Sequence, residues 1–457
     1  MKAKELINIG YKQGPVIGLL LKACEEAKKL KFSAEDIRSI VKQIHENPSL
    51  FTDREIWKDV ASELFKIRNP KETYTFTKKE YKVWGSDIEE EAIKQMERAM
   101  DLPISVFGAV MPDCHSGYGL PIGGVLATDN SVIPFAVGVD IACRMMLTVL
   151  PCDIKEIDSN ENDFIEAIEK NTLFGVGEGF KQKKYHPVMD KDWSFSRIVH
   201  QVKDTAWEQL GTSGSGNHFL DIGEIEFCDG RKYVAILTHS GSRGAGAQIA
   251  QYYTKLAESL HPYLPPEYKR LAWLDMNKEE GQEYWKAMEL MGEYASANHH
   301  LIHDGVLKTM KMDTVMQIEN HHNFAWKEIH NGKEVIVHRK GATPAGLGIM
   351  GIIPGCMASP GFLVKGKGNL LSLNSASHGA GRAMSRKKAK ETNRWSQVNG
   401  VLKQKKVKLI SAGLDEVPNA YKNIHTVMSA QSDLVEVVAK FTPRIVKMSG
   451  DGESEDK

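Results

Sequence analysis

Apolar and polar residues in the first seventy or so positions alternate with the spacing of amphipathic helices. Ser33-Ala-Glu-Asp36 and Thr52-Asp-Arg-Glu55 each resemble a capping box, and each precedes such an amphipathic run. The pattern stops between Asn69 and Lys79, where Pro70 and a Thr/Lys-rich stretch interrupt it. We therefore predict a helical N-terminal extension at residues 1–72, followed by a separate catalytic domain at residues 73–450.

Beyond this boundary the pattern changes to short β-branched runs that end in Gly-rich turns, at residues 132–139, 233–237 and 335–337. Longer helical segments lie between them, such as Lys278 to Leu301. Because strands and helices do not alternate regularly, the pattern favours an α+β fold over a doubly wound sheet. Residues 451–457 are polar and acidic, and we expect this tail to be disordered.

Composition narrows the class of protein. The 457 residues are 42% hydrophobic and 26% charged, as in an ordinary globular protein. Lys plus Arg and Asp plus Glu balance at 59 each, so contacts with nucleic acid would have to come from local basic patches. The N-terminal apolar run is too short for a membrane helix, and we expect no membrane association. Six cysteines without a CxxC pair favour a reducing, cytoplasmic location.

Six Gly-rich segments carry polar residues inside otherwise apolar sequence. In chain order they hold Asp113 and His115; Asp140 and Cys143; Asn217, His218 and Asp221; His239 and Arg243; His321, His322 and Asn323; and His378, Arg382 and Arg386. Glycine allows close backbone approach to a ligand and unusual φ angles, which phosphate and metal loops need. One such histidine is more often structural than a ligand, but six such segments together favour a functional site.

Asp140-x-x-Cys143 is the strongest metal-binding candidate. A carboxylate and a thiolate three residues apart, after an apolar run, can face one cavity, and with imidazoles they suit Zn, Mn or Fe-type divalent ions. Dispersed ligands favour a catalytic site assembled by the fold. A closed structural zinc site and an inert buried thiol at Cys143 are the alternatives.

His378-Gly-Ala-Gly-Arg382 is the strongest candidate for covalent chemistry. Small residues after His378 let a phosphate approach the ring, and a neutral imidazole can attack phosphorus without a separate base. Arg382 and Arg386 are four apart, so on one helical face both could grip phosphates. The alternative is a helix N-terminus with an exposed basic face.

The motifs PDxHxGxG, VGVDIxC, GxGNHFL, HxGSRGxG, HHN, HRKGAT, IPGxM and HGAGRxMSR occur in this order. From about Lys82 to Lys447 the chain thereby resembles the RtcB-type RNA-splicing ligases. The resemblance implies an RtcB-like α+β fold, with central β-sheets flanked by helices and the active site in a central cleft. It also implies a ligase that joins RNA 3′-phosphate or 2′,3′-cyclic phosphate ends to 5′-hydroxyl ends, using GTP and two Mn²⁺, in tRNA splicing or RNA repair.

Site residues follow from the same resemblance. It assigns one Mn²⁺ to Asp140, Cys143 and His218, and the other to Cys143, His239 and His322, with Cys143 bridging. His378 becomes the nucleophile that carries GMP. RNA contacts fall to Arg243, Arg382 and Arg386. The expected nucleotide contacts are Asn217, His218, Phe219, Leu220, Asp221, His322, Asn323, Pro354, Gly355, Cys356, Met357, Gly361, His378, Gly379, Ala380, Gly381, Tyr421 and Lys447.

Three departures fall in the expected guanine pocket. The family usually has Glu at the position of Asp221 and Ser at the position of Cys356, and a second family Ser aligns with Gly361. These departures keep one alternative function open, a metal-dependent RNA-end phosphoesterase that does not ligate. Arg144 also replaces a common Gly, next to the expected bridging thiolate, where it could tune the metals or contact RNA.

Partners beyond the RNA ends are an open question at this point. An activating helper protein is one candidate. Residues 1–72 lie outside the resemblance, and they could be an RNA-substrate module or a packing or oligomerisation element.

Overall fold

The computed structural model describes residues 1–12, 14–68 and 74–450. The chain divides into two compact units. The first consists of Met1–Thr75 with Lys255–Ala272, and the second of Phe76–Thr254 with Trp273–Lys457. The predicted limits at residues 72 and 73 and the acidic tail at 451–457 lie outside the described residues. Among the described residues, no helix is both long and apolar enough to cross a membrane.

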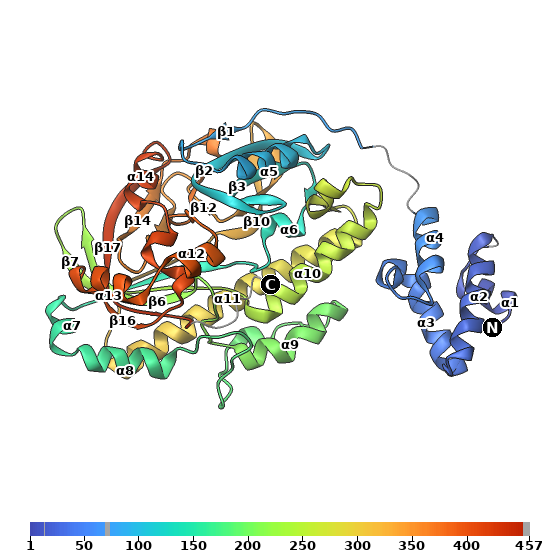
Figure 1. Ribbon diagram of the computed structural model, residues 1–457, viewed down its shortest axis with the longest axis horizontal. Coiled ribbons are helices and arrows are strands. Elements are labelled where there is room, and N and C mark those ends of the chain that lie inside the picture. The colour runs from blue at the N-terminus through green and yellow to red at the C-terminus, as the bar shows by residue number, and fades with distance from the viewer. Residues whose placement is uncertain (13, 69–73, 451–457) are drawn as a thin grey trace. The chain divides into compact units, whose positions relative to one another are not determined.

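Helices make up most of the described part of the first unit. They are α1 (Ala3–Ile9), α2 (Pro15–Lys29), α3 (Ala34–Glu46) and α4 (Lys58–Arg68), as Figure 1 shows. Ser33 caps α3 as expected, because its hydroxyl accepts from Asp36 N at 3.0 Å and the Asp36 carboxylate accepts from Ser33 N. The second predicted capping box is wrong: α4 begins only at Lys58, and the Thr52 hydroxyl donates to Ser49 O instead.

A large antiparallel sheet dominates the second unit. Its strands follow the order β13 (Met350–Ile353), β14 (Gly361–Gly366), β17 (Val435–Met448), β6 (Phe219–Phe227), β7 (Lys232–Ser240), β5 (Arg144–Leu150) and β9 (Met316–His321), and β16 (Lys408–Ser411) pairs with β17 in parallel. Ile352 N on β13 donates to Asn320 Oδ1 on β9 at 3.0 Å. The two terminal strands therefore meet, and the sheet is nearly closed into a barrel.

A second sheet and a set of helices complete this unit. The strands of this sheet run β1 (Lys82–Val83), β2 (Ser105–Tyr118), β3 (Leu120–Thr128), β11 (Lys333–Lys340) and β10 (Asn323–His330), with two small pairs, β12 (Ala342–Pro344) with β15 (Ser375–Ser377) and β4 (Ser131–Val132) with β8 (Leu274–Asp275). The described helices that begin in this part are α5 (Glu90–Asp101), α6 (Pro134–Val137), α7 (Lys155–Ser159), α8 (Glu161–Asn171), α9 (Arg197–Gln209), α10 (Arg243–Leu260), α11 (Glu279–Met310), α12 (Arg386–Thr392), α13 (Trp395–Gln404) and α14 (Ile424–Ser429). This confirms the predicted α+β class.

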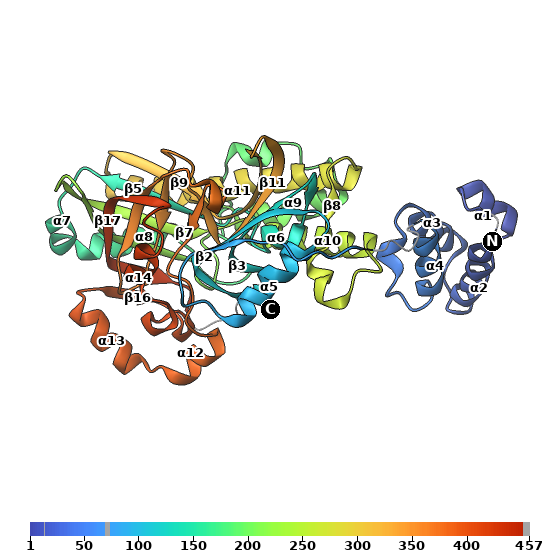
Figure 2. The same cartoon turned by 90° about the horizontal axis from the view of Figure 1, so that it is seen from above.

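The two faces of the large sheet have different neighbours because strand side chains alternate. On β7, Ala235 and Leu237 point into the barrel, where they pack with Met145 and other residues of a central apolar cluster. Val234 and Ile236 point outward and pack against α8 and α11. Figures 1 and 2 both show the long helix α11 lying along this outer face. By this alternation Thr238 faces α11 and His239 faces inward.

Three of the four predicted secondary-structure segments of this unit are confirmed. Residues 233–237 lie in β7, residues 335–337 lie in β11, and the helix expected from Lys278 to Leu301 is α11, which extends to Met310. The run at 132–139 is not a strand beyond its first residue. Pro134 presets a helical φ at the first position of α6, and the run turns into this short helix.

Candidate metal centre and reactive histidine

Four neighbouring strands end at the same edge of the large sheet, and each end carries a candidate ligand. In the strand register His239 is opposite both Met145 and Phe219, while Arg144 is opposite His321. Cys143, which precedes Arg144 on β5, therefore lies beside His239 on β7, and His322, which follows His321 on β9, lies beside Cys143. His218 precedes Phe219 on β6, the other neighbour of β7. Cys143 and His322 are 179 positions apart in the sequence, and the fold brings them together.

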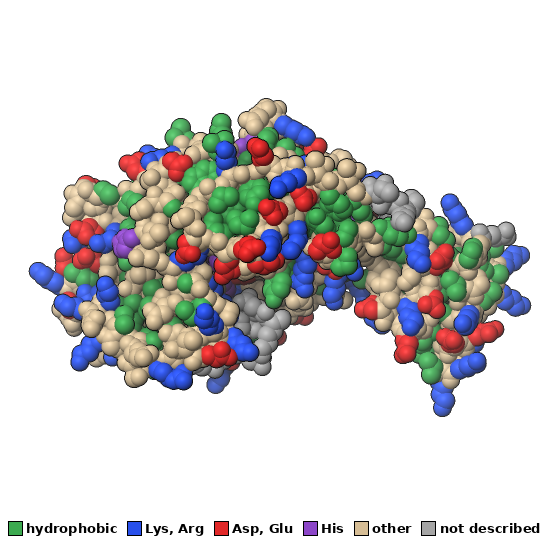
Figure 3. All heavy atoms as spheres, turned by 45° about the horizontal axis from the view of Figure 1, so that its top comes forward, with side chains coloured by type: hydrophobic (Ala, Val, Ile, Leu, Met, Phe, Trp, Pro, Cys, Tyr) green, Lys and Arg blue, Asp and Glu red, His purple; other side chains and the backbone are tan. Residues whose placement is uncertain are grey.

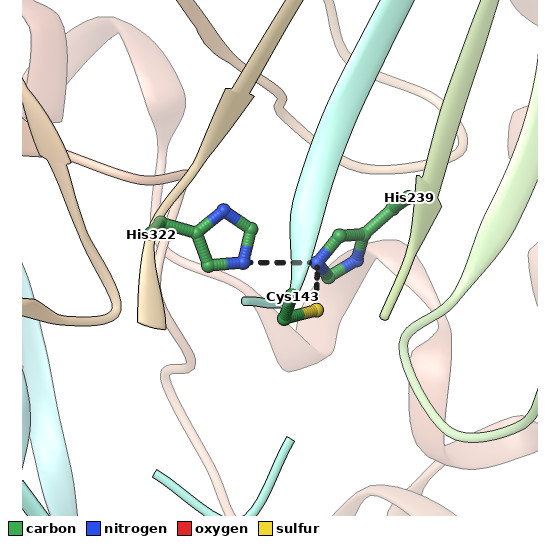
Figure 4. A group of neighbouring side chains, drawn as sticks. All are labelled: Cys143, His239 and His322. Carbon is green, nitrogen blue, oxygen red and sulfur yellow. Dashed lines mark hydrogen bonds between the residues drawn. The ribbon is translucent and has the colours of Figure 1, made fainter. Parts of the chain in front are cut away.

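The first candidate group is Cys143, His239 and His322, drawn in Figure 4. Cys143 Sγ lies 3.1 Å from His239 Nε2, and that nitrogen lies 3.1 Å from His322 Nε2. All three side chains are buried. Their ligand atoms lie within 4.8 Å of one another, which is close enough for one ion to contact all three.

The second candidate group is Asp140, Cys143 and His218, and it shares the thiol with the first. His218 Nε2 lies 3.1 Å from Asp140 Oδ2 and 3.4 Å from Cys143 Sγ. These two groups contain the same residues that the resemblance assigned to the two Mn²⁺. A thiolate at Cys143 would be within reach of both ions.

A backbone carbonyl fixes which nitrogen of the His239 ring is available. His239 Nδ1 lies 3.1 Å from Asn217 O, and a carbonyl only accepts, so Nδ1 carries the proton and Nε2 presents a lone pair to the site. His218 Nδ1 lies 3.0 Å from Ser213 O, an acceptor, and 3.2 Å from Arg243 Nη1, a donor, so these contacts do not decide between the two tautomers of His218. The mixed carboxylate, imidazole and thiolate set of the two groups fits a divalent cation.

Burial keeps the imidazoles of His239 and His322 neutral. Desolvation, with the nearby His218, lowers the pKa of His239 to about 3. Desolvation also holds the pKa of His322 well below its usual value. Burial opposes ionisation of Asp140, but His218 and Arg243 outweigh it and lower the pKa of this carboxyl. Neutral imidazole and ionised carboxylate are the protonation states that bind metal.

The turn that carries Asp140 and Cys143 is held in an unusual conformation. Ala142 has a φ of +57°, a left-handed value that costs a non-glycine residue on the order of 1 kcal/mol. Asn323 compensates: its backbone carbonyl accepts from Ala142 N at 2.7 Å, and its side-chain amide donates to Asp140 O at 3.3 Å. Asn323 also accepts from Gly341 N, so its side chain ties the metal turn to the β11–β12 connection.

His378 lies next to the first group, and Asp113 orients it. The rings of His378 and His322 have centroids 5.0 Å apart. One carboxylate oxygen of Asp113 accepts from His378 Nδ1 at 2.7 Å, from His378 N at 3.0 Å and from Gly379 N at 3.2 Å. Burial alone would raise the pKa of Asp113, but His378 and these donors outweigh it and lower the pKa. Nδ1 of His378 thus carries a proton, which leaves the lone pair on Nε2.

Comparison with known proteins identifies the family. The family model described as tRNA-splicing ligase RtcB matches residues 95–204 and 191–449. The chain belongs to the RtcB family. Two similar proteins of Escherichia coli strains are named RNA-splicing ligase RtcB1 and RNA-splicing ligase RtcB; they are 36% and 35% identical, over 78% of this chain and 94% of each relative. The tRNA-splicing ligase RtcB of Nanoarchaeum equitans is 34% identical over 73% of this chain and 86% of the relative.

The residues expected to contact a nucleotide in this RtcB chain come from six separate segments. Gly379 lies against Pro354, since a Cβ added to Gly379 would sit 3.5 Å from Pro354 O. Lys447 is opposite Leu220 in the strand register. Phe219, Met357 and Tyr421 pack in one apolar cluster. The segments therefore converge beside His378, although which of these side chains contacts a nucleotide stays a prediction.

Asp221 is the distinctive polar group of that region. Its Oδ1 is buried without a hydrogen-bond partner among the described residues, and desolvation raises its pKa well above the usual value. At the substituted position Cys356, the Ser359 hydroxyl accepts from Cys356 N at 2.8 Å and lies 3.1 Å from the sulfur. A serine hydroxyl is thus present here, supplied by Ser359 rather than by residue 356.

The three arginines expected to contact RNA are engaged within the protein. Arg243 is buried, with Nη1 3.2 Å from His218 Nδ1. Arg382 pairs with Glu416 at 3.2 Å, and Arg386 pairs with Asp415 at 2.9 Å and with Glu416. Arg382 precedes α12, so the expectation that Arg382 and Arg386 share a helical face is wrong. Asp415 and Glu416 were not among the predicted residues; the adjacent acids in the LDE segment were the available signal.

Arg144 lies on the opposite face of β5 from the thiol. Its guanidinium pairs with Glu319 at 3.1 Å and donates to Gly292 O on α11 at 2.7 Å. His338 is also structural, since its Nε2 accepts from Ile133 N at 2.9 Å and the residue is fully buried. Figure 3 shows acidic and basic side chains interspersed on the face it presents, consistent with the balanced composition.

Proposed function

We propose that this RtcB-family chain is a GTP- and Mn²⁺-dependent RNA ligase that joins a 3′-phosphate or 2′,3′-cyclic phosphate end to a 5′-hydroxyl end. The observation that carries the proposal is the position of His378, with Nδ1 held by Asp113 at 2.7 Å and the ring 5.0 Å from that of His322. His378 belongs to neither candidate metal group, so the buried carboxylate on its Nδ1 points to another use of this ring. A nucleophile needs such a carboxylate, because it stabilises the positive ring that forms during attack.

In the proposed reaction His378 Nε2 attacks the α-phosphorus of GTP. A P–N bond forms, the bond to pyrophosphate breaks, and GMP stays on the ring. GMP then passes to the RNA 3′-phosphate and regenerates His378. The 5′-hydroxyl attacks this activated phosphate, GMP leaves, and a phosphodiester remains. A cyclic phosphate end must first be opened by water to a 3′-phosphate.

Asp140, Cys143 and His218 would hold one Mn²⁺, and Cys143, His239 and His322 would hold the other. Bound cations at this place offset the negative charge of the phosphoryl groups. The protein's own contribution is orientation: the carbonyl of Asn217 holds the tautomer of His239.

Guanine selection is assigned to Asp221. An ionised carboxylate can accept from guanine N1–H and from its exocyclic amine, donors that adenine does not present at that edge. The buried, unpartnered Oδ1 of Asp221 supports this assignment, because guanine would supply the missing donors. Those donors would also lower the pKa of the carboxyl, which desolvation raises in the free protein. RNA ends would be bound by Arg243, Arg382 and Arg386, which requires each guanidinium to exchange part of its present contacts for phosphate oxygens.

The test is formation and transfer of the covalent adduct. Incubation with α-labelled GTP and Mn²⁺ should give an acid-labile, base-stable labelled protein, and the label should move to an RNA with a 3′-phosphate. His378→Ala should give no adduct, while its Mn²⁺ affinity stays close to that of the wild type. A wild-type chain that opens cyclic phosphates but never takes up label would instead support the phosphoesterase.

A further inference from the structure

Two buried histidines of α11, His299 and His303, belong to neither candidate metal group. They lie one helical turn apart and are fully buried on the outer side of the large sheet. Strand β7 lies between them and the metal centre. Its residue Thr238 faces the two histidines, and the next residue, His239, faces the metal centre.

The hydroxyl of Thr238 is shared by both rings. Thr238 Oγ1 lies 2.7 Å from His299 Nδ1 and 2.7 Å from His303 Nε2. The remaining nitrogens are also used: His303 Nδ1 lies 2.7 Å from Thr148 Oγ1, and His299 Nε2 lies 3.2 Å from Ser240 O. Gln317 Nε2 donates to Thr148 Oγ1 at 2.9 Å, which extends the chain of contacts to β9.

Only one arrangement of protons satisfies all these contacts when both rings are neutral. Ser240 O can only accept, so His299 Nε2 carries the proton and Nδ1 accepts from the Thr238 hydroxyl. That hydroxyl has one proton, so its oxygen accepts from His303 Nε2–H, and His303 Nδ1 accepts from the Thr148 hydroxyl. Desolvation lowers the pKa of His303 to about 3 and the pKa of His299 well below its usual value, so both rings are neutral at pH 7.

The same helix holds the backbone that follows His239. Asn298 Nδ2 donates to Gly241 O at 3.1 Å, and Asn298 Oδ1 accepts from Gly211 N at 2.8 Å. The next amide, Ser242 N, donates to Asp140 Oδ1 at 2.9 Å. The peptides of residues 240–242 therefore connect α11 to His239, which they follow in the chain, and to Asp140, which accepts from Ser242 N. His239 belongs to the first candidate metal group and Asp140 to the second.

We propose that Thr238, His299 and Ser240 O form a directional hydrogen-bond relay that positions His239 and the Ser240–Ser242 turn for metal binding. Gln317, Thr148 and His303 complete the hydrogen bonds on the other side of Thr238 and are not part of this relay. Thr238 and His299 are positioning residues, since neither contacts the ion or the reacting atoms. The relay fixes the rotation of β7 about its axis and the plane of the Ser240 peptide. The inference rests on the proposed function only in that a divalent ion binds at the two groups.

The experiment compares three variants of the full chain. Thr238→Val keeps the shape but removes the shared hydroxyl, and Thr238→Ser restores it. Thr148→Val is the matched control, because it removes an equally buried hydroxyl that contacts His303 but lies outside the relay. Mn²⁺ affinity is measured by isothermal titration calorimetry, and ligand geometry by the absorption spectrum of the Co²⁺-loaded protein, in which thiolate and imidazole ligation has a characteristic signature.

Thr238→Val should weaken Mn²⁺ binding by about 10- to 100-fold and shift the Co²⁺ spectrum. Removing residues that orient a metal-binding histidine weakens metal affinity by this factor in other proteins. Thr238→Ser should bind Mn²⁺ close to wild type. Thr148→Val should lower the melting temperature and leave metal affinity and spectrum unchanged. Thr238→Ala serves in the same way if Thr238→Val does not fold.

Two results overturn the relay: unchanged Mn²⁺ affinity in folded Thr238→Val, or an equal loss in Thr148→Val, which would indicate general destabilisation. A wild-type chain that binds neither ion overturns the relay together with the metal assignment. If the metal data follow expectation and no guanylylated protein forms, the relay stands and the proposed ligase activity fails.

Discussion

Replacing Asp113 with Asn removes the charge that orients His378 while keeping the side-chain volume. In the native chain one oxygen of Asp113 accepts from three N–H groups of His378 and Gly379, and the other oxygen is buried without a partner among the described residues. In Asp113→Asn either a neutral oxygen takes the first place and the amide N–H groups are left unpaired, or the amide flips and points an N–H at His378 Nδ1. The flip favours the tautomer with the proton on Nε2, which cannot attack phosphorus.

The magnitude follows from the kind of bond that is lost. A hydrogen bond to a charged group contributes about 1.5–3 kcal/mol. If this difference is realised in the transition state, where the His378 ring gains positive charge, the guanylylation rate falls by roughly 10- to 150-fold at about 1.4 kcal/mol for each factor of ten. A variant held in the wrong tautomer would be slower still.

The assay is single-turnover formation of labelled protein from α-labelled GTP, with enzyme in excess over nucleotide. Mn²⁺ affinity is the internal control and should stay near the wild-type value, because Asp113 belongs to neither candidate metal group. Asp113→Asn guanylylation at the wild-type rate, with metal bound and the chain folded, would refute the assignment of Asp113 as the orienting group.

Three further predictions concern the metal centre and buried ionisable groups. Cys143→Ser should weaken Mn²⁺ binding at both groups and abolish the thiolate-to-Co²⁺ absorption band; a retained band would contradict a Cys143 ligand. The raised pKa of Asp221 means that the folded chain keeps a proton that the unfolded chain loses above about pH 4, so the melting temperature of Asp221→Asn should exceed that of the wild type increasingly as pH rises. Metal-free protein should lose stability as pH falls from about 6.5 to about 5, by about 2 kcal/mol for each histidine that burial keeps neutral, and a flat melting profile there would contradict this. Burial lowers the pKa to about 3 or 4 at His115, His239, His303, His321 and His338, and it holds the pKa of His299 and His322 well below the usual value.

The sequence could point to the members of the two candidate metal groups because their chemistry is local. Asp140 and Cys143 stand out as polar residues in an apolar, Gly-rich segment, and the same holds for His218 and His239. The long helix α11 was predictable for a similar reason, since its periodicity continues over many turns. The prediction of a strand at 132–139 was wrong because the β-branched composition does not reveal that Pro134 starts a helix there.

Pairing between distant residues could not be predicted. Arg144 follows Cys143, the residue shared by both candidate metal groups, so the sequence suggests a guanidinium next to the metal centre. Strand alternation places its side chain on the opposite face, where Glu319 and Gly292 O bind it. The carboxylates that engage Arg382 and Arg386 come from a segment about thirty residues downstream. Such contacts depend on strand register and loop path, which no local pattern encodes.

Register also explains why contacts on the outer face matter for a site on the inner face. A slip of β7 by one residue would turn His239 toward α11 and present Thr238 or Ser240 to Cys143. Backbone hydrogen bonds alone do not forbid that slip, because every residue can supply them. Side-chain contacts do forbid it, because the Thr238 hydroxyl fits between the rings of His299 and His303. A histidine in place of Thr238 would bring a third imidazole ring into the space next to these two. The polar groups on the outer face therefore specify the strand register on which metal binding would depend. Their loss should lower metal affinity first.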